Sequence, residues 1–197
     1  MLALEGDRLA DAENLLQRAV SLSNPSSILS ASRYADVRQK KFSAAIETLD
    51  RALSSDPSDA IALFDIGIAY EGIGDIDKSI AAFRKAADIN PSYVNAHYNL
   101  GTLLMRMGRY HEAIESLNRA ILLNPQFSDA IYNIAAAYAQ LGDKRNAVIS
   151  LKNAIELNPR LAGEALKDED FRKIWSEADL RRSAAVVHSS EKSTKNR

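Results

Sequence analysis

The sequence predicts an all-α protein built as a solenoid of antiparallel helix pairs. The first observation is an Asn-Pro or Asp-Pro pair that recurs four times, with its prolines spaced 34 residues apart. A fixed period of this length is typical of stacked repeats, in which each unit buries its apolar face against its neighbours. The second observation is that apolar residues between the pairs follow spacings of three and four, as in amphipathic helices. The four pairs are Asp56-Pro57, Asn90-Pro91, Asn124-Pro125 and Asn158-Pro159.

The most regular unit spans residues 94–127 and predicts two helices joined by a short turn. Its first helix carries an apolar face from Ala96 to Leu104 and stops near Gly108, because glycine readily takes the left-handed conformation that closes a helix. A second apolar face begins at Tyr110. The pair Asn124-Pro125 ends this second helix, since proline lacks an amide donor and disfavours helical geometry in the residue before it.

Small residues recur in the same slots of successive units. A small side chain at a crossing point allows two helix axes to approach closely, so these slots are predicted to be contacts between helices. The slots are Gly67, Gly101 and Ala135 in the first helices, and Ala45, Ser79, Ala113 and Ala147, with Ala52, Ala86, Ala120 and Ala154, in the second helices.

This pattern resembles the tetratricopeptide repeat family over about residues 6–159. The third unit carries it most fully, with His97-Tyr98-Asn99-Leu100-Gly101, then Gly108-Arg109-Tyr110, Ala113, Ala120 and Asn124-Pro125. The tryptophan that the family usually has near the start of each unit is replaced here by Leu63, His97 and Ile131. The resemblance implies a right-handed superhelical solenoid, with regular units expected at residues 60–93, 94–127 and 128–161.

The N-terminal part of the chain fits the repeat less well. Residues 26–57 are expected to form a degenerate unit, because Arg33 and Lys40 occupy slots that glycine takes in the regular units. Residues 1–25 resemble the second half of another unit. The chain is therefore expected to begin in the middle of a repeat.

The C-terminal part is expected to close the stack. Residues 162–182 are predicted to form capping helices, because a terminal repeat must hide its last apolar face. Asp168 is the predicted N-cap of the second of these helices, and Phe171, Ile174 and Trp175 form its apolar stripe. Residues 183–197 are basic and poor in apolar side chains, which predicts a disordered tail.

Composition and charge exclude several classes of function. The chain of 197 residues has no cysteine, so disulfides and thiolate metal sites are ruled out. The last 17 residues hold five Lys or Arg against one Glu, which leaves the remainder at −5 and argues against nucleic-acid binding. No apolar run reaches the roughly 18 residues that a membrane span needs, and the first residues lack the features of a secretory signal. No membrane insertion and a cytoplasmic location are therefore expected.

No group of residues predicts catalysis, a metal site or a bound cofactor. Gly72-Ile73-Gly74 falls at a helix-terminating turn rather than between a strand and a helix, so it is not a phosphate-binding loop. The three histidines, His97, His111 and His188, lack the spacing of metal ligands. The chain is therefore expected to be non-enzymatic.

The family resemblance places the first helix of each pair on a concave surface, where the residues not used for packing form a predicted groove. Phe64, Tyr98 and Tyr132 are expected to form an aromatic stripe that supplies contact energy. Asn99 and Asn133 lie one repeat apart and are expected to stack as a ladder whose amides bind a peptide backbone. The predicted groove residues are Phe64, Asp65, Asn95, Tyr98, Asn99, Arg106, Asp129, Tyr132, Asn133 and Gln140.

The sequence thus predicts a scaffold or adaptor that holds a peptide or protein segment in the concave groove. Asp65 and Asp129 favour a ligand of basic character. Tyrosine and asparagine in these slots also pack between helices, so the alternative for the site is packing alone. Two other functions remain open. The chain could be the substrate-recruiting arm of a larger enzyme, as this family's repeats are in some glycosyltransferases, or a self-assembling scaffold that forms a homo-oligomer through its open N-terminal face.

Overall fold

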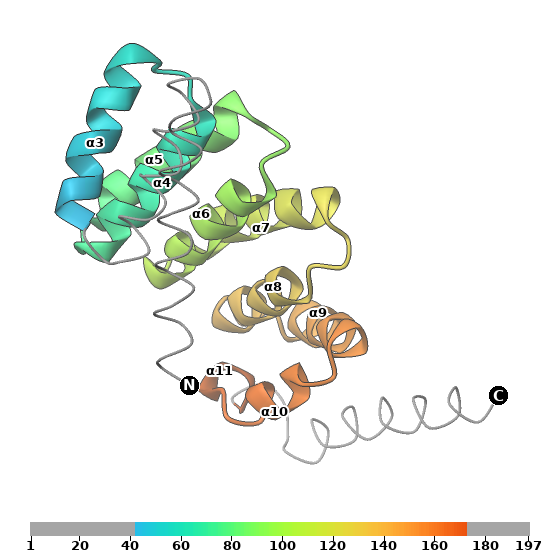
Figure 1. Ribbon diagram of the computed structural model, residues 1–197. Helices are drawn as coiled ribbons and strands as arrows, with labels where there is room; N and C mark the ends of the chain where they lie inside the picture. The colour runs from blue at the N-terminus through green and yellow to red at the C-terminus, as the bar shows by residue number, and fades with distance from the viewer. Residues whose placement is uncertain (1–41, 173–197) are drawn as a thin grey trace, which may run out of the picture. The chain divides into compact units, whose positions relative to one another are not determined.

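The computed structural model describes residues 42–172, and this part of the chain is helical with no strand. The prediction of an all-α fold is confirmed for it. The helices are α3 (Phe42–Ser55), α4 (Ala60–Gly72), α5 (Ile76–Ile89), α6 (Val94–Arg106), α7 (Tyr110–Leu123), α8 (Ser128–Gln140), α9 (Lys144–Leu157), α10 (Leu161–Ala165) and α11 (Glu169–Arg172) (Figure 1).

Some predictions fall outside the described residues. They are the partial unit at residues 1–25, the first helix of the degenerate unit before Phe42, the stripe residues Ile174 and Trp175, and the basic tail at residues 183–197.

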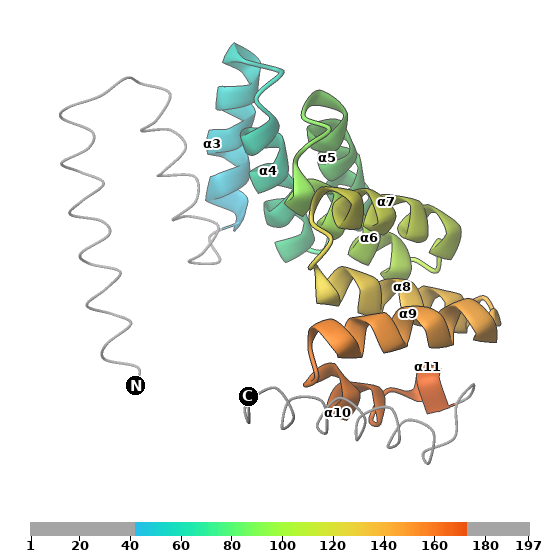
Figure 2. The same cartoon turned by 90° about the vertical axis from the view of Figure 1, so that its right-hand side faces the viewer.

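The chain divides into two compact units, one from Met1 to Pro91 and the other from Ser92 to Arg197. In the first unit, α3 packs on α4, and α4 pairs with α5. In the second unit, α6 pairs with α7 and α8 with α9, and α7 also packs on α8 (Figures 1 and 2). Consecutive helices therefore pack in pairs, as the period of 34 residues predicts.

A glycine turn joins the two helices of each pair. Gly74, Gly108 and Gly142 have φ angles of 83°, 72° and 76°. A residue with a Cβ atom is strained in this left-handed region, whereas glycine is not. A Cβ atom on any of the three would meet nothing within 4 Å, so backbone conformation rather than crowding explains the glycines.

The Asn-Pro pairs end the second helices, as predicted. Asn90, Asn124 and Asn158 have φ angles of −122°, −133° and −138° and so leave helical geometry. This is the restriction that a following proline imposes. Each asparagine amide still donates to the alanine carbonyl four residues earlier, at 2.8–2.9 Å, so the last turn of each helix stays closed.

Two glycines lie where paired helices cross. A Cβ atom on Gly67 would stand 2.7 Å from the ring of Phe83, and one on Gly101 would stand 2.6 Å from Cγ of Leu117. Both partner side chains are completely buried. Ser79 adds a buried hydrogen bond at the first crossing, where its Oγ donates to the carbonyl of Gly67 at 2.7 Å. The predicted packing role of these small residues is confirmed.

Each unit has its own apolar core. In the first, Leu49 of α3 and Ile66 of α4 belong to one buried cluster. In the second, Leu117 of α7 packs with residues of α8. Leu151 of α9 belongs to a cluster that continues into α10 and α11, where Phe171 is completely buried. The predicted capping role of Phe171 is therefore confirmed.

Candidate functional site

Two of the predicted groove residues, Phe64 and Asp65, lie on α4 in the first unit. Their exposed fractions are only 9% and 6%. The Phe64 ring packs on that of Phe83 with 5.3 Å between centroids. Both side chains are therefore mostly enclosed, and the structure gives them little of the accessible surface that a groove residue needs. Apolar residues run around the whole circumference of α4, and a helix of this kind is covered on several faces.

The second unit presents two of the predicted aromatic residues in equivalent places. Tyr98 on α6 and Tyr132 on α8 are both half-buried. The Tyr98 ring lies 4.5 Å from that of Phe127, and the Tyr132 ring lies 5.2 Å from that of Phe171 in an edge-on contact. Each tyrosine is thus held by a second aromatic ring while part of its surface stays accessible.

A hydrogen bond links the two helices at this surface. Nδ2 of Asn133 donates to Oη of Tyr98 across 3.5 Å, the long limit for such a bond. Asn99 is half-buried, and its backbone carbonyl accepts from Oγ1 of Thr102 at 2.9 Å. Among the described residues, Asn133 therefore bonds to Tyr98, and the stacking of Asn99 and Asn133 as a peptide-binding ladder stays a prediction.

Four of the predicted groove residues line one pocket of about 460 Å³. They come from α6 and α8, and the rest of the lining comes from the end of α9 and the beginning of α10. The sequence predicted the lining residues of α6 and α8 as groove residues, but it did not predict those of α9 and α10. The lining residues are Tyr98, Asp129, Tyr132 and Asn133, with Asn158, Arg160, Leu161 and Glu164.

Acidic groups surround the two tyrosines. Burial raises the pKa of Tyr98, and the negative charge of Asp129 raises it further. Burial is also the main reason why the pKa of Tyr132 lies well above its ordinary value, followed by the charge of Asp168 and the hydrogen bond to it. Both phenols therefore stay neutral, and the pocket holds hydroxyl groups beside carboxylates.

The capping segment engages two predicted groove residues. Oη of Tyr132 donates to Oδ2 of Asp168 at 3.1 Å, and the side-chain amide of Gln140 donates to the carboxylate of Asp170. Asp168 also accepts from the amide of Asp170 at 3.0 Å, the bond expected of an N-cap. Tyr132 and Gln140 are thus shared between the predicted groove and the cap of the last repeat.

The other predicted residues lie along α6. Asn95 and Arg106 are exposed near its two ends, and Asn99 lies between them. None of the three lines the pocket. The structure therefore brings together only part of the predicted groove.

The sequence analysis did not predict that residues after the last Asn-Pro pair contribute to the pocket. Arg160 and Glu164 line it, and Asp168 bonds to Tyr132 beside it. One signal could have found them. In a stack, the segment after a second helix takes the place of the next first helix, so it must lie beside the preceding first helix, α8.

Within residues 42–172, no three His, Asp or Glu side chains gather where they could hold a metal ion. No helix in the same range is long and apolar enough to cross a membrane.

Stacked helix pairs define the class of helical-repeat scaffolds for protein interactions. In this chain they leave a polar and aromatic pocket lined in part by the first helices α6 and α8. Models of one family, described as tetratricopeptide repeat, match residues 34–94, 94–127 and 128–161. The chain belongs to the tetratricopeptide repeat family.

Solved structures with a similar fold include two crystal structures of MamA. One has a TM-score of 0.67 and 24% identity, covering 81% of this chain and 95% of that chain. The other has a TM-score of 0.69 and 23% identity, covering 83% and 87%. A structure of MamA AMB-1 has a TM-score of 0.64 and 26% identity, covering 78% and 92%. A search with this sequence among curated proteins found no match.

Proposed function

We propose that this chain is a non-enzymatic adaptor whose second unit binds a basic peptide or protein segment. The site is the pocket between α6, α8 and the α9–α10 connection. The observation that supports it is the convergence of Tyr98, Asp129, Tyr132 and Asn133 on one pocket. These side chains come from two successive repeats, as contacts to an extended ligand would.

The pocket offers the kinds of group that bind peptides. The accessible surfaces of Tyr98 and Tyr132 supply aromatic contact, which is a frequent source of binding energy at interfaces. The amide of Asn133 donates only a long bond to Tyr98, so a peptide carbonyl at a shorter distance would be a better acceptor.

The charges of the pocket favour a cation. Asp129 and Glu164 are exposed acids in its lining, and Arg160 is the one base there. Asp168, which accepts from Tyr132, adds a carboxylate beside the lining. A lysine or arginine of the ligand would therefore find an excess of negative charge, and such complementarity selects the partner.

The proposal is tested by panning a random peptide library on the full chain and measuring the enriched peptides by titration calorimetry. We expect peptides rich in Lys or Arg. The double change Asp129→Lys and Glu164→Lys should weaken their binding at least about tenfold, or 1.4 kcal/mol. The matched control is Glu156→Lys, which reverses an exposed acid on α9 outside the pocket. Enrichment without basic residues, or equal affinity for the double variant, would contradict the proposal.

A further inference from the structure

The outer face of α7 differs from those of α5 and α9, although the three helices hold the same place in successive repeats. Leu122 on α7 is 71% exposed, more than any other large apolar side chain in the described part of the chain. The residues one repeat before and after it are Asp88 and Glu156, both exposed. Because the neighbouring repeats form this helix with an acid in that slot, the fold does not require an apolar residue at Leu122.

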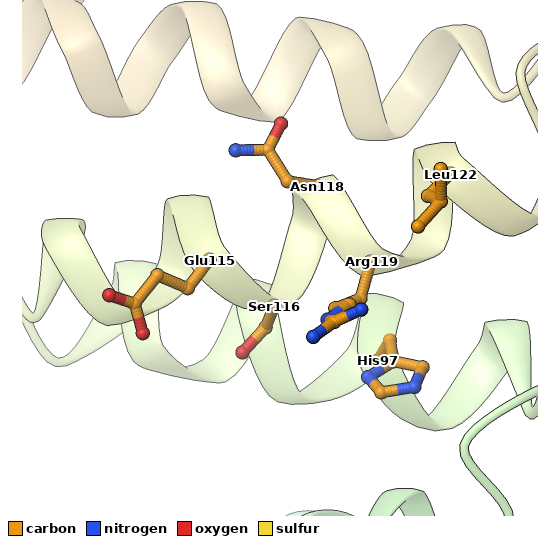
Figure 3. A pocket seen from close by; sticks show the side chains of 6 residues that line it. All are labelled: His97, Glu115, Ser116, Asn118, Arg119 and Leu122. Atoms are coloured by element: carbon orange, nitrogen blue, oxygen red, sulfur yellow. The ribbon is translucent and has the colours of Figure 1, made fainter.

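Leu122 borders a surface hollow of about 660 Å³ (Figure 3). His97 lines the hollow from α6, in the slot that Leu63 and Ile131 fill in the neighbouring repeats. Leu63 is almost completely buried, whereas His97 and Ile131 are both partly exposed, so His97 departs from the pattern by its polar ring rather than by its exposure. Two departures from the repeat pattern, one on each helix of the pair, therefore meet at one place. The remaining lining residues are Glu115, Ser116, Asn118 and Arg119.

The charges of the hollow are separated in space. Figure 3 shows the guanidinium of Arg119 beside the ring of His97, while Glu115 points away from both. Arg119 is exposed and makes no ion pair or hydrogen bond with any residue in the range 42–172. Its donors are therefore available to an external acceptor, and their planar arrangement matches a carboxylate.

We propose that this hollow is a second binding site, which takes an acidic segment of a partner protein with a carboxylate next to an aliphatic side chain. The carboxylate accepts two hydrogen bonds from Arg119, which is the strong bidentate arrangement. The aliphatic side chain packs on Leu122 and removes apolar surface from water. Asn118 adds an amide at the edge, whereas the Ser116 hydroxyl donates to the carbonyl of Glu112 and can only accept from a ligand.

This site is separate from the pocket on α6 and α8. The two share no lining residue, and they favour ligands of opposite charge. This inference therefore does not depend on the proposed function. Together, the two sites would let the chain bind two different segments at once.

The test uses two synthetic peptides of equal length, one with leucines spaced by glutamates and the other with leucines spaced by lysines. Each is titrated into the full ¹⁵N-labelled chain by NMR, and the affinity is measured by calorimetry. The variants are Arg119→Glu and Leu122→Glu. The second gives α7 the acid that α9 has at Glu156, so the fold tolerates it. The matched control is Ile149→Glu, which makes the same kind of change at a 48% exposed position on α9.

We expect the glutamate peptide to bind and to shift the resonances of Arg119 and its neighbours. Both variants should weaken this binding at least about tenfold, while Ile149→Glu leaves it unchanged and all three keep the wild-type helical circular dichroism. The proposal is overturned if the glutamate peptide does not bind, if the lysine peptide binds this face equally well, or if the control loses as much affinity as the variants.

Discussion

Helices α4 and α6 hold the same place in successive repeats, yet the residues at two equivalent positions on them differ in burial. Phe64 is the counterpart of Tyr98, and Asp65 that of Asn99. The first member of each pair is buried, whereas the second is half-buried. The comparison shows that a repeat period establishes which residues are equivalent without establishing that they share an environment.

The two helices differ in how their apolar residues are distributed. On α4 they surround the axis, and even its polar Asp65 is enclosed. On α6 polar side chains such as Asn95 and Asn99 line one side and apolar ones the other. Because an apolar stripe on one side buries only that side, the polar side of α6 keeps an accessible surface.

The largest expected difference between the two helices is in the cost of truncating the equivalent aromatic residues. Phe64→Ala should lower the free energy of unfolding by about 3–5 kcal/mol, the usual cost of removing a buried phenylalanine. Tyr98→Ala should cost about half as much, because its ring is only half-buried. Urea unfolding followed by circular dichroism measures both. Equal losses would show that α6 is as much a core helix as α4.

The next effect concerns what α4 and α6 share. Gly67→Leu and Gly101→Leu should each cost about 1–3 kcal/mol by overpacking, because a Cβ atom at either position meets a buried side chain at less than 3 Å. Gly163→Leu is the control, since a Cβ atom there meets nothing within 4 Å. Thermal melts of the three variants test the assignment, and a wild-type melting temperature for either crossing variant would refute it.

A smaller effect should distinguish Tyr132 from Tyr98. Tyr132→Phe removes a hydroxyl that donates to the carboxylate of Asp168, so it should cost about 1 kcal/mol. Tyr98→Phe removes only the long contact from Asn133 and should cost less than about 0.5 kcal/mol. Urea unfolding again gives the comparison. If Tyr98→Phe cost as much as Tyr132→Phe, the bond from Tyr132 to Asp168 would stabilise the fold no more than the long contact between Asn133 and Tyr98.

The smallest effect is a difference in acid sensitivity between helix starts. Asp75 caps α5 and Asp143 caps α9 through bonds to backbone amides, whereas Arg109 in the same slot of α7 makes no such bond. The hydrogen bond from Nζ of Lys78, which lies 2.9 Å from Oδ2 of Asp75, is the main reason why the pKa of Asp75 is lowered, and the capping bond from the Lys78 backbone amide contributes less. For Asp143 the main cause is the bond from the amide of Asn146.

The sign of this pH dependence follows from the lowered pKa values. Each carboxylate favours the folded chain above its ordinary pKa of 3.8, and this contribution is lost as the pH falls through the lower folded value. Carboxyl ¹³C NMR titration should give both residues a pKa below 3.8. Asp75→Asn and Asp143→Asn should each make stability less sensitive to acid. Unshifted pKa values would contradict the assignment of this acid sensitivity to Asp75 and Asp143.

The local features of the fold could be predicted because they depend on neighbours in the chain. A left-handed glycine such as Gly108 and a pre-proline residue such as Asn124 carry their conformational preference with them, so helix ends were placed correctly. Asp168 was placed at a helix start for the same kind of reason. The apolar periodicity was then sufficient to predict which helices pair, although it gives no individual contact between them.

The candidate site was predicted only in part because it depends on contacts between distant residues. Tyr98 and Tyr132 line the same pocket of the second unit, since a repeat carries equivalent residues to equivalent positions. Their partners were not foreseen. Asn133 bonds to Tyr98, and Asp168 reaches Tyr132 from 36 residues further along the chain.

The sequence by itself therefore determined the family, the helix pairs and the turns that join them, because short-range stereochemistry and a fixed period carry this information. Only the tertiary structure decided which equivalent residues are buried, how the capping segment engages α8, and which side chains meet at a pocket. These features depend on packing between segments far apart in the chain, where residues at equivalent positions are buried in one repeat and half-buried in the next.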